Sequence, residues 1–237
     1  VRRELGFDEL RRDVASLAAA LKSEGVNEGD RVAGFLPNCP EAIIAMLATA
    51  SIGAVWSSCS PDFGINGVVD RFGQIEPKVL FCADGYFYNG KRCDSLAAVR
   101  GVVAVIKSVQ RTVVVPFTGD HVNLDGLPNA LAWRDFRGGE AELTFVSVPF
   151  AHPLYVMYSS GTTGVPKCIV HGAGGTLLQH LKEHVLHCDV VSGDRLFYFT
   201  TCGWMMWNWL ASGLAAGATL ILYDGSPFHE NGRILWR

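Results

Sequence analysis

The sequence carries little net charge, and this argues against one large class of partners. Its 20 Lys and Arg residues nearly balance its 23 Asp and Glu residues, which leaves a formal net charge of −3 at pH 7. Domains that bind nucleic acid usually gather Lys and Arg on a basic face. We therefore expect no nucleic-acid partner for this chain.

The cysteines lack the spacing of a disulfide framework or a zinc site. Their number is odd, no C-x-x-C pair occurs and most lie in apolar stretches; the seven are Cys39, Cys59, Cys82, Cys93, Cys168, Cys188 and Cys202. Such cysteines are typical of small buried side chains in a reducing compartment. The first residues, Val-Arg-Arg-Glu-Leu, also lack the apolar core of a secretory signal. We therefore expect a cytoplasmic protein of the cytosol.

One stretch without charged residues, from Leu196 to Tyr223, raises the alternative of a membrane span. A span needs about 20 consecutive apolar residues. Polar residues and glycines interrupt this stretch, namely Thr200, Thr201, Gly203, Asn208, Ser212, Gly213 and Gly217. A buried helix from about Trp204 to Ala215 and a strand from about Ala218 to Tyr223 explain the pattern better.

Composition and periodicity predict an α/β protein. Of the 237 residues, 49% are apolar and 18% are charged, so the chain can bury a large core. The predicted elements are, in order, a helix over 7–21, a strand over 32–36, a helix from 41, a strand from 54, a helix over 65–75 and a strand over 79–82. This alternation is typical of layered helices on a largely parallel sheet. Residues 102–106 and 113–115 favour edge or inter-layer strands, and 118–139 favour a polar surface connection.

The run from Ser159 to Lys167 gathers groups that bind phosphate. It reads Ser-Ser-Gly-Thr-Thr-Gly-Val-Pro-Lys and holds four hydroxyls, two glycines and a lysine. Hydroxyls and amides donate hydrogen bonds to anionic oxygens, glycines allow close approach, and lysine adds positive charge. Pro166 before the lysine and Cys168 after it exclude a Walker loop. Apolar runs on both sides predict a glycine- and threonine-rich loop between two strands, with a merely solvated turn as the alternative.

Four histidines, His171, His180, His184 and His187, follow this run closely. His180 and His184 lie one helical turn apart, a spacing that can chelate a metal if a third ligand converges. The sequence specifies no such ligand. We therefore interpret these two histidines as solvated or capping residues.

The nine-residue run resembles the signature of adenylate-forming enzymes, the superfamily of acyl-CoA synthetases, peptide-synthetase adenylation domains and luciferases. That signature is rich in Ser, Thr and Gly and ends in Gly-x-Pro-Lys, and the order of motifs along the rest of the chain is also similar. The resemblance implies that residues 1–237 form part of the large N-terminal, AMP-binding domain of such an enzyme. It also implies that the loop binds the phosphates of ATP through Ser159, Ser160, Gly161, Thr162, Thr163, Gly164 and Lys167.

Within this implied site, Thr162, Thr163 and Lys167 are the expected catalytic residues. The two threonines would contact phosphate oxygens or the Mg²⁺ ion that bridges them, and Thr163 is the candidate magnesium contact. Phosphoryl and adenylyl transfers depend on positioning and charge neutralisation rather than on a protein nucleophile. A surface lysine without a ligand is the alternative for Lys167.

The resemblance also implies contacts for the other substrates. In short-chain acyl-CoA synthetases a Gly-Trp pair leads into the acid pocket, which places Trp204, Met205 and Met206 at a small carboxylate site. Trp207 and Trp209 are expected in the core. Lys91 is the candidate contact for the 3′-phosphate of coenzyme A, with a solvated lysine as the alternative.

Three stretches, 56–64, 71–78 and 87–91, most resemble the acetoacetyl-CoA synthetases within this superfamily. They imply an acid–thiol ligase that activates acetoacetate with ATP and passes it to coenzyme A. The alternatives are a synthetase for acetate or propionate and a non-catalytic nucleotide-binding chain. The family's later motifs and its small C-terminal domain are not recognisable here, so we expect a piece of a longer enzyme that is inactive alone.

Overall fold

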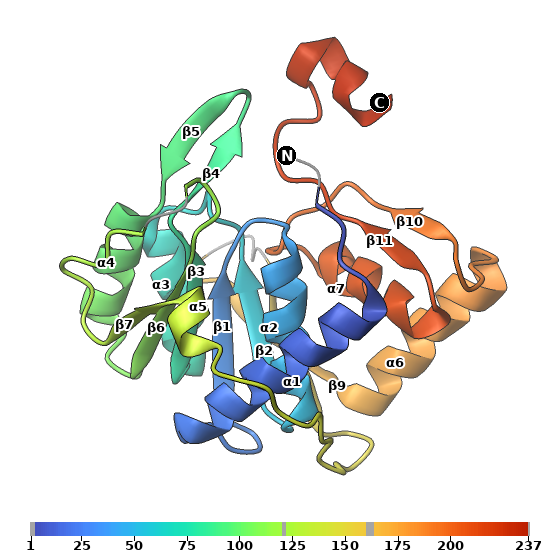
Figure 1. The fold of residues 1–237 in the computed structure, drawn as a ribbon, viewed down its shortest axis with the longest axis horizontal. Coiled ribbons are helices and arrows are strands. Elements are labelled where there is room, and N and C mark those ends of the chain that lie inside the picture. Colours follow the sequence, from blue (N-terminus) through green and yellow to red (C-terminus); the bar gives the residue numbers. More distant parts are fainter. Residues whose placement is uncertain (1–2, 120–121, 160–163, 237) are drawn as a thin grey trace.

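A seven-stranded sheet forms the centre of the computed structural model, which describes residues 3–119, 122–159 and 164–236 (Figure 1). The strand order is β7-β6-β3-β1-β2-β8-β9, and every neighbouring pair is parallel except β8 and β9. The strands are β1 (Arg31–Phe35), β2 (Val55–Cys59), β3 (Val79–Ala83), β6 (Arg111–Val115), β7 (Ala130–Ala132), β8 (Pro153–Ser159) and β9 (Lys167–Gly172). The predicted α/β class with a largely parallel sheet is confirmed.

Helices cover both faces of this sheet. One face carries α1 (Phe7–Ser23), α2 (Pro40–Ser51) and α5 (Trp133–Phe136), and the other carries α3 (Ile65–Ile75) and α4 (Leu96–Val105). Successive strand residues point to opposite faces, so Val32 joins the first core and Ala33 the second. The inner strands are therefore apolar throughout, as parallel strands buried on both faces require.

The last part of the chain forms a second, smaller layer beside β8 and β9 (Figure 1). A two-stranded parallel sheet joins β10 to β11, and helices pack between it and the large sheet. The helices are α6 (Ala173–Leu181) and α7 (Met205–Ser212), and the strands are β10 (Arg195–Phe197) and β11 (Thr219–Ile221). The chain also forms the π-helical turn η1 (Lys182–His187) and the 3₁₀ helices η2 (Gly213–Ala216) and η3 (His229–Trp236). The expected buried helix and strand within 196–223 are thus present as α7 and β11. Across the described ranges, no helix is both long and apolar enough to cross a bilayer.

A hairpin of β4 (Gly85–Tyr88) and β5 (Lys91–Asp94) projects from the end of β3 (Figure 1). Its two-residue turn is Asn89-Gly90, and both residues have positive φ, 49° and 76°. Asn-Gly suits a tight hairpin turn because both residues tolerate this backbone region. The turn places Lys91 at the exposed end of the hairpin.

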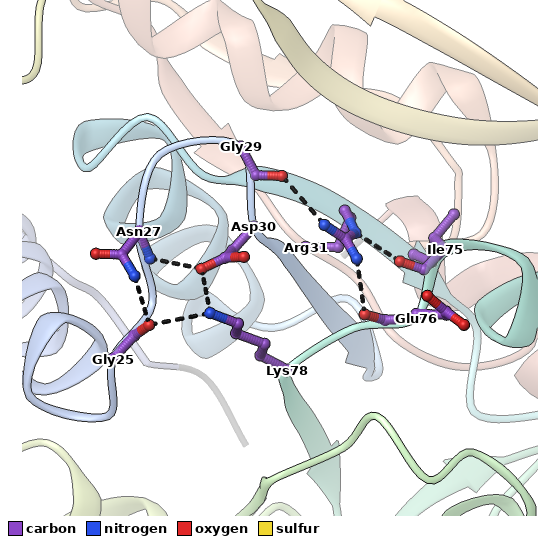
Figure 2. Close-up of polar contacts among 8 residues, drawn as sticks. All are labelled: Gly25, Asn27, Gly29, Asp30, Arg31, Ile75, Glu76 and Lys78. Atoms are coloured by element: carbon purple, nitrogen blue, oxygen red, sulfur yellow. Dashed lines mark hydrogen bonds and ion pairs between the residues drawn. The ribbon is translucent and has the colours of Figure 1, made fainter.

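The amino ends of the strands are held by a polar network, drawn in Figure 2. Asp30 accepts hydrogen bonds from Lys78 Nζ at 2.6 Å and from the backbone N–H of Asn27 at 2.8 Å. Arg31 donates to the carbonyls of Ile75 and Glu76, at 2.6 and 3.2 Å. Burial alone would raise the pKa of Asp30, but the bonds from Lys78 and Asn27 lower it below its ordinary value. The network fixes β1 to the α3–β3 connection at the end of the sheet where these two strands begin.

Three predicted segments differ in the structure. Residues 102–105 belong to helix α4 rather than to a strand, because Leu96, Val99 and Val103 place the valines on a helical stripe that packs on the sheet. Strand β6 contains 113–115 but lies inside the sheet, between β3 and β7. The supposed polar connection over 118–139 contains β7 and α5, whose Trp133 and Phe136 stack edge-on against Phe81.

Candidate functional site

The predicted phosphate-binding loop connects the end of β8 to the start of β9. Ser159 ends β8 and pairs across the antiparallel ladder with Lys167, the first residue of β9. The prediction of a loop between two strands is therefore confirmed. Ser160, Gly161, Thr162 and Thr163 lie outside the described residues.

The described end of the loop has the properties that an anion site needs. Gly164 has φ = +100°, a conformation that side chains other than glycine rarely adopt. Lys167 is exposed, and within the described ranges it forms no ion pair with an acidic side chain. Its positive charge is therefore available to a ligand rather than neutralised by the protein.

The loop follows the carboxyl end of β8, and this is the end of the sheet where bound ligands are expected. Strands β2 and β8 are parallel, with Trp56 opposite Tyr155, so their carboxyl ends share one edge. After β1 the chain passes to α2 on one face, and after β2 it passes to α3 on the other. In α/β proteins such a reversal marks the end of the sheet where ligands bind, at the carboxyl ends of the two strands.

Helix α7 is fastened at the carboxyl ends of β1 and β2. The indole Nε1 of Trp207 donates to Asn38 Oδ1 at 2.9 Å, and Ser58 Oγ donates to the carbonyl of Cys202 at 2.6 Å. Gly203 passes so close to the chain after β2 that a Cβ there would lie 3.2 Å from the backbone nitrogen of Ser60. The segment that begins α7 is therefore held against the ends of β1 and β2.

The predicted acid-site residues lie on this fastened segment. Trp204 is 67% exposed and Met205 is 50% exposed, while Met206 is half-buried. Trp207 and Trp209 are buried, which confirms their expected place in the core. An exposed tryptophan at this end of the sheet is free to contact a ligand.

Two residues at this end of the sheet, Asn38 and Asp224, were not singled out from the sequence. The buried Asn38 follows β1, and its backbone N–H donates to Asp224 Oδ1 at 3.4 Å. Burial raises the pKa of Asp224 to about 6, against the lowering effect of the bond from Asn38. Asp224 Oδ2 is buried and has no hydrogen-bond partner among the described atoms. The available signal was their position, since Asn38 follows the first parallel strand and Asp224 follows the apolar run 218–223.

The β4–β5 hairpin is anchored by a buried carboxylate at the end of β3. Asp84 accepts hydrogen bonds from the backbone N–H groups of Phe117 and Thr118, at 2.8 and 2.9 Å, and from Thr118 Oγ1 at 2.7 Å. Arg92 on the hairpin lies 3.8 Å from the same carboxylate. Lys91 is therefore exposed on a hairpin that is fixed at the carboxyl end of β3. The loop begins at the carboxyl end of β8, at the same end of the sheet.

An arginine and two aromatic rings line the end of β8, next to Ser159. The guanidinium of Arg71 lies 4.6 Å from the ring centre of Phe63 and 5.7 Å from that of Tyr158. Ser57 Oγ lies 2.9 Å from the hydroxyl of Tyr158, within hydrogen-bond distance. Burial raises the pKa of Tyr158 well above its ordinary value, so the ring stays a neutral wall at physiological pH.

The prediction for His180 and His184 was wrong in one respect, because both side chains are buried rather than solvated. His184 Nε2 lies 2.9 Å from the carbonyl of Trp209 and 3.1 Å from Ser212 Oγ, so it joins η1 to α7. Burial lowers the pKa of His180, which is therefore neutral near pH 7. Within the described ranges, no three His, Cys, Asp or Glu side chains converge as metal ligands. His180 lines a hollow between α6 and Phe150, near the end of β9 opposite to Lys167.

The cysteine prediction holds for four of the seven residues. Cys39, Cys59, Cys82 and Cys202 are buried, Cys93 is half-buried, and all seven are free thiols. Cys168 and Cys188 are exposed, because they lie on an edge strand and at a helix end that little else covers. Burial raises the pKa of Cys59 and Cys82, so these thiols are unreactive.

Comparison with protein families matches residues 1–237 to the family described as AMP-binding enzyme. The chain belongs to the AMP-binding enzyme family. Among curated relatives, this AMP-binding chain is 60% identical to acetoacetyl-coenzyme A synthetase of Rhizobium meliloti over 98% of its own length and 36% of that protein. It is 53% identical to acetoacetyl-CoA synthetase of Rattus norvegicus, over 97% of this chain and 35% of the relative.

A solved structure gives the same result for the fold. The AMP-binding chain superposes on the acetoacetyl-CoA synthetase from Streptomyces lividans with a TM-score of 0.90 and 50% identity, over 95% of this chain and 34% of that one. The expected resemblance to adenylate-forming enzymes is confirmed. The chain spans about a third of the length of the relatives that it matches.

Proposed function

We propose that the protein is an AMP-forming acid–thiol ligase that joins acetoacetate to coenzyme A. In the first step the acid's carboxylate would attack the α-phosphorus of ATP, which gives acetoacetyl-adenylate and releases pyrophosphate. In the second step the thiol of coenzyme A would attack the acyl carbon, which gives acetoacetyl-CoA and AMP. The observation that carries the proposal is Lys167, which ends a hydroxyl-rich loop and forms no ion pair among the described residues, in a chain 60% identical to an acetoacetyl-CoA synthetase.

The loop is the proposed site for the triphosphate. Lys167 would neutralise phosphate charge, and the N–H of Gly164 would approach an oxygen closely because no side chain intervenes. The hydroxyls of Ser159, Ser160, Thr162 and Thr163 and the amide of Gly161 complete the proposed set. When bound, Mg²⁺ would reduce the charge of the phosphates, and Thr163 is the residue proposed to hold it.

The acid and coenzyme A are proposed to bind along the same edge of the sheet. Trp204, Met205 and Met206 would line the acid site, because their segment is held at the carboxyl ends of β1 and β2. Lys91 would meet the 3′-phosphate of coenzyme A from the β4–β5 hairpin. The seven free cysteines support a reducing compartment, and we propose the cytosol.

One experiment tests this function and its two alternatives. The protein, at the length its host makes, is assayed for acid-dependent exchange of pyrophosphate into ATP and for thioester formation with acetoacetate, acetate, propionate and butyrate. The proposal expects the highest kcat/KM for acetoacetate, with some activity on the other acids, because an underfilled pocket discriminates by only about 1–3 kcal/mol. Acetate or propionate as the best acid would make the protein a different short-chain synthetase. Nucleotide binding without exchange would show a non-catalytic chain.

A further inference from the structure

We infer that Gln74, on helix α3, is a positioning residue for Lys167, at the described end of the phosphate-binding loop. This inference rests on the proposed function, because the loop matters here as the site of the triphosphate. Gln74 Nε2 donates a hydrogen bond to the carbonyl of Pro166 at 2.8 Å. Pro166 immediately precedes Lys167, so the contact fixes the backbone from which the lysine projects.

The same side chain also contacts the residue after the lysine. Gln74 Oε1 lies 3.5 Å from Cys168 Sγ, which donates to it. The amide therefore spans the position of Lys167, with its nitrogen on the residue before and its oxygen on the residue after. Gln74 Nε2 is itself steadied by the carbonyl of Asp70, one turn back on α3. Few side chains other than an amide offer a donor and an acceptor at this reach.

Strand β9 needs such support because it is the last strand of the sheet. Its only ladder partner in the described sheet is β8, and its first four residues, 167–170, are all exposed. Strand β8 holds Lys167 from one side, through its pairing with Ser159. Gln74 thus supplies a second attachment from a helix packed on a different part of the sheet. Without it, the backbone before Lys167 is held from one side only.

The placement of α3 makes this attachment rigid. Val68, Phe72 and Ile75 bury one side of the helix in the core of the sheet, and Arg71 packs against Phe63 and Tyr158 at the end of β8. Gln74 itself is exposed. A rigid helix that projects one exposed amide onto a loop is suited to holding that loop in a ligand-ready position, since charged contacts gain most when they are preorganised.

The test compares Gln74→Met with Gln110→Met, a substitution at another exposed glutamine. Methionine has nearly the reach of glutamine, but it cannot donate to Pro166 and is only a weak acceptor for Cys168. The primary measurement is the Kd of ATP, by calorimetric titration of the protein at the length its host makes. We expect Gln74→Met to weaken ATP binding about five- to tenfold, as the loss of one loop-holding hydrogen bond does. Gln110→Met is expected to match the wild type, and the midpoint of unfolding by guanidinium is expected to stay unchanged in both.

Three further variants separate positioning from general damage. Gln74→Glu keeps the acceptor but loses the donor, so its ATP affinity should fall at least as far as that of Gln74→Met. Cys168→Ala removes only the weaker contact and should change the Kd less than twofold. In a Lys167→Ala background, Gln74→Met should also cost less than twofold, because a residue that acts through Lys167 has nothing left to position. The KM for acetoacetate at saturating ATP should not move.

The outcomes separate this inference from the proposed function. An unchanged ATP Kd in Gln74→Met, with weakened binding in Lys167→Ala, would overturn the role of Gln74 alone. Additive effects of the two substitutions would also overturn it, because they would show that Gln74 acts elsewhere. If the wild type binds ATP but forms no acyl-CoA, the proposed function fails, while the Kd values still decide the role of Gln74.

Discussion

Trp207 on α7 and Asn38 after β1 share a buried hydrogen bond of 2.9 Å between the indole Nε1 and Oδ1. The two residues are 169 positions apart in the sequence. Asn38 also lies within 3.5 Å of the carbonyls of Thr200 and Tyr223 through its Nδ2. One amide side chain thus ties the second layer of the protein to the carboxyl end of the central sheet.

The first prediction follows from this bond. Asn38→Ala leaves the Trp207 donor unpaired in the core, and such a group costs about 1–3 kcal/mol. We expect a lower guanidinium midpoint for Asn38→Ala and no change for Asn66→Ala, which truncates an exposed asparagine at the start of α3. Trp207→Phe removes the donor. In a double-mutant cycle, the variant with both substitutions should lose less stability than the sum of the two single losses. Full additivity would show that the bond contributes nothing.

The second prediction concerns Lys167. Removal of one preorganised charged contact to the phosphates should cost about 2–4 kcal/mol of transition-state stabilisation, so Lys167→Ala should slow adenylation by tens to hundreds of fold. Lys182→Ala is the matched control, because Lys182 is also exposed but lies on η1. The measurement is acetoacetate-dependent exchange of pyrophosphate into ATP. A rate for Lys167→Ala within twofold of the wild type would contradict the assignment of the loop.

Local patterns predicted the elements that bring the site together. The helical stripe of 65–75 and the apolar strands near 32 and 79 needed only periodicity, and the loop needed only its composition and its flanking strands. The same local logic failed at 102–106, where a run of β-branched residues favoured a strand. In the structure these valines pack on the sheet from α4, so tertiary packing outweighs local propensity.

The contacts across the site could not be predicted in the same way. Gln74 with Pro166, Asn38 with Trp207, and Asn38 with Asp224 join residues 92, 169 and 186 positions apart. No periodicity encodes such pairs, because they depend on strand order and on where each helix crosses the sheet. The burial of His184 was missed for a similar reason, since the helix that covers it, α7, lies 25 positions further along at Trp209.

The third prediction contrasts two neighbouring tryptophans. Trp204 is 67% exposed, so Trp204→Ala should leave the unfolding midpoint nearly unchanged but should raise the KM for acetoacetate at saturating ATP. Trp207 is fully buried, so Trp207→Ala should cost about 3–5 kcal/mol of folding stability. Steady-state kinetics and guanidinium unfolding of both variants decide the matter. An unchanged KM for every acid tested in Trp204→Ala would remove this residue from the acid site.

The fourth prediction concerns residues 1–237 expressed alone. These residues span about 36% of the Rhizobium meliloti relative, and catalysis of this kind depends mainly on the positioning of both substrates. We expect no measurable acetoacetyl-CoA from them. Apolar side chains such as Phe145, Leu186 and Phe228 are at least 74% exposed, which favours aggregation. Thioester formation by purified, monomeric protein of these residues would show that they hold a complete site.

The last prediction is the pH dependence that Asp224 adds to stability. The folded protein raises the pKa of this carboxyl from 3.8 to about 6, chiefly through burial. Between these values the folded state holds a proton that the unfolded state has released, so stability should fall as pH rises through this window. The full cost is present above about pH 6 and amounts to at most about 3 kcal/mol.

Asp224→Asn removes the titration and should be more stable than the wild type at pH 7.5. At pH 4 and below, where Asp224 is largely protonated in the wild type, the difference should shrink towards zero. The measurement is the difference in unfolding free energy between wild type and variant at both pH values, with Asp70→Asn on the exposed side of α3 as the control. A difference that is the same at both pH values would show that Asp224 titrates alike in the folded and unfolded chains.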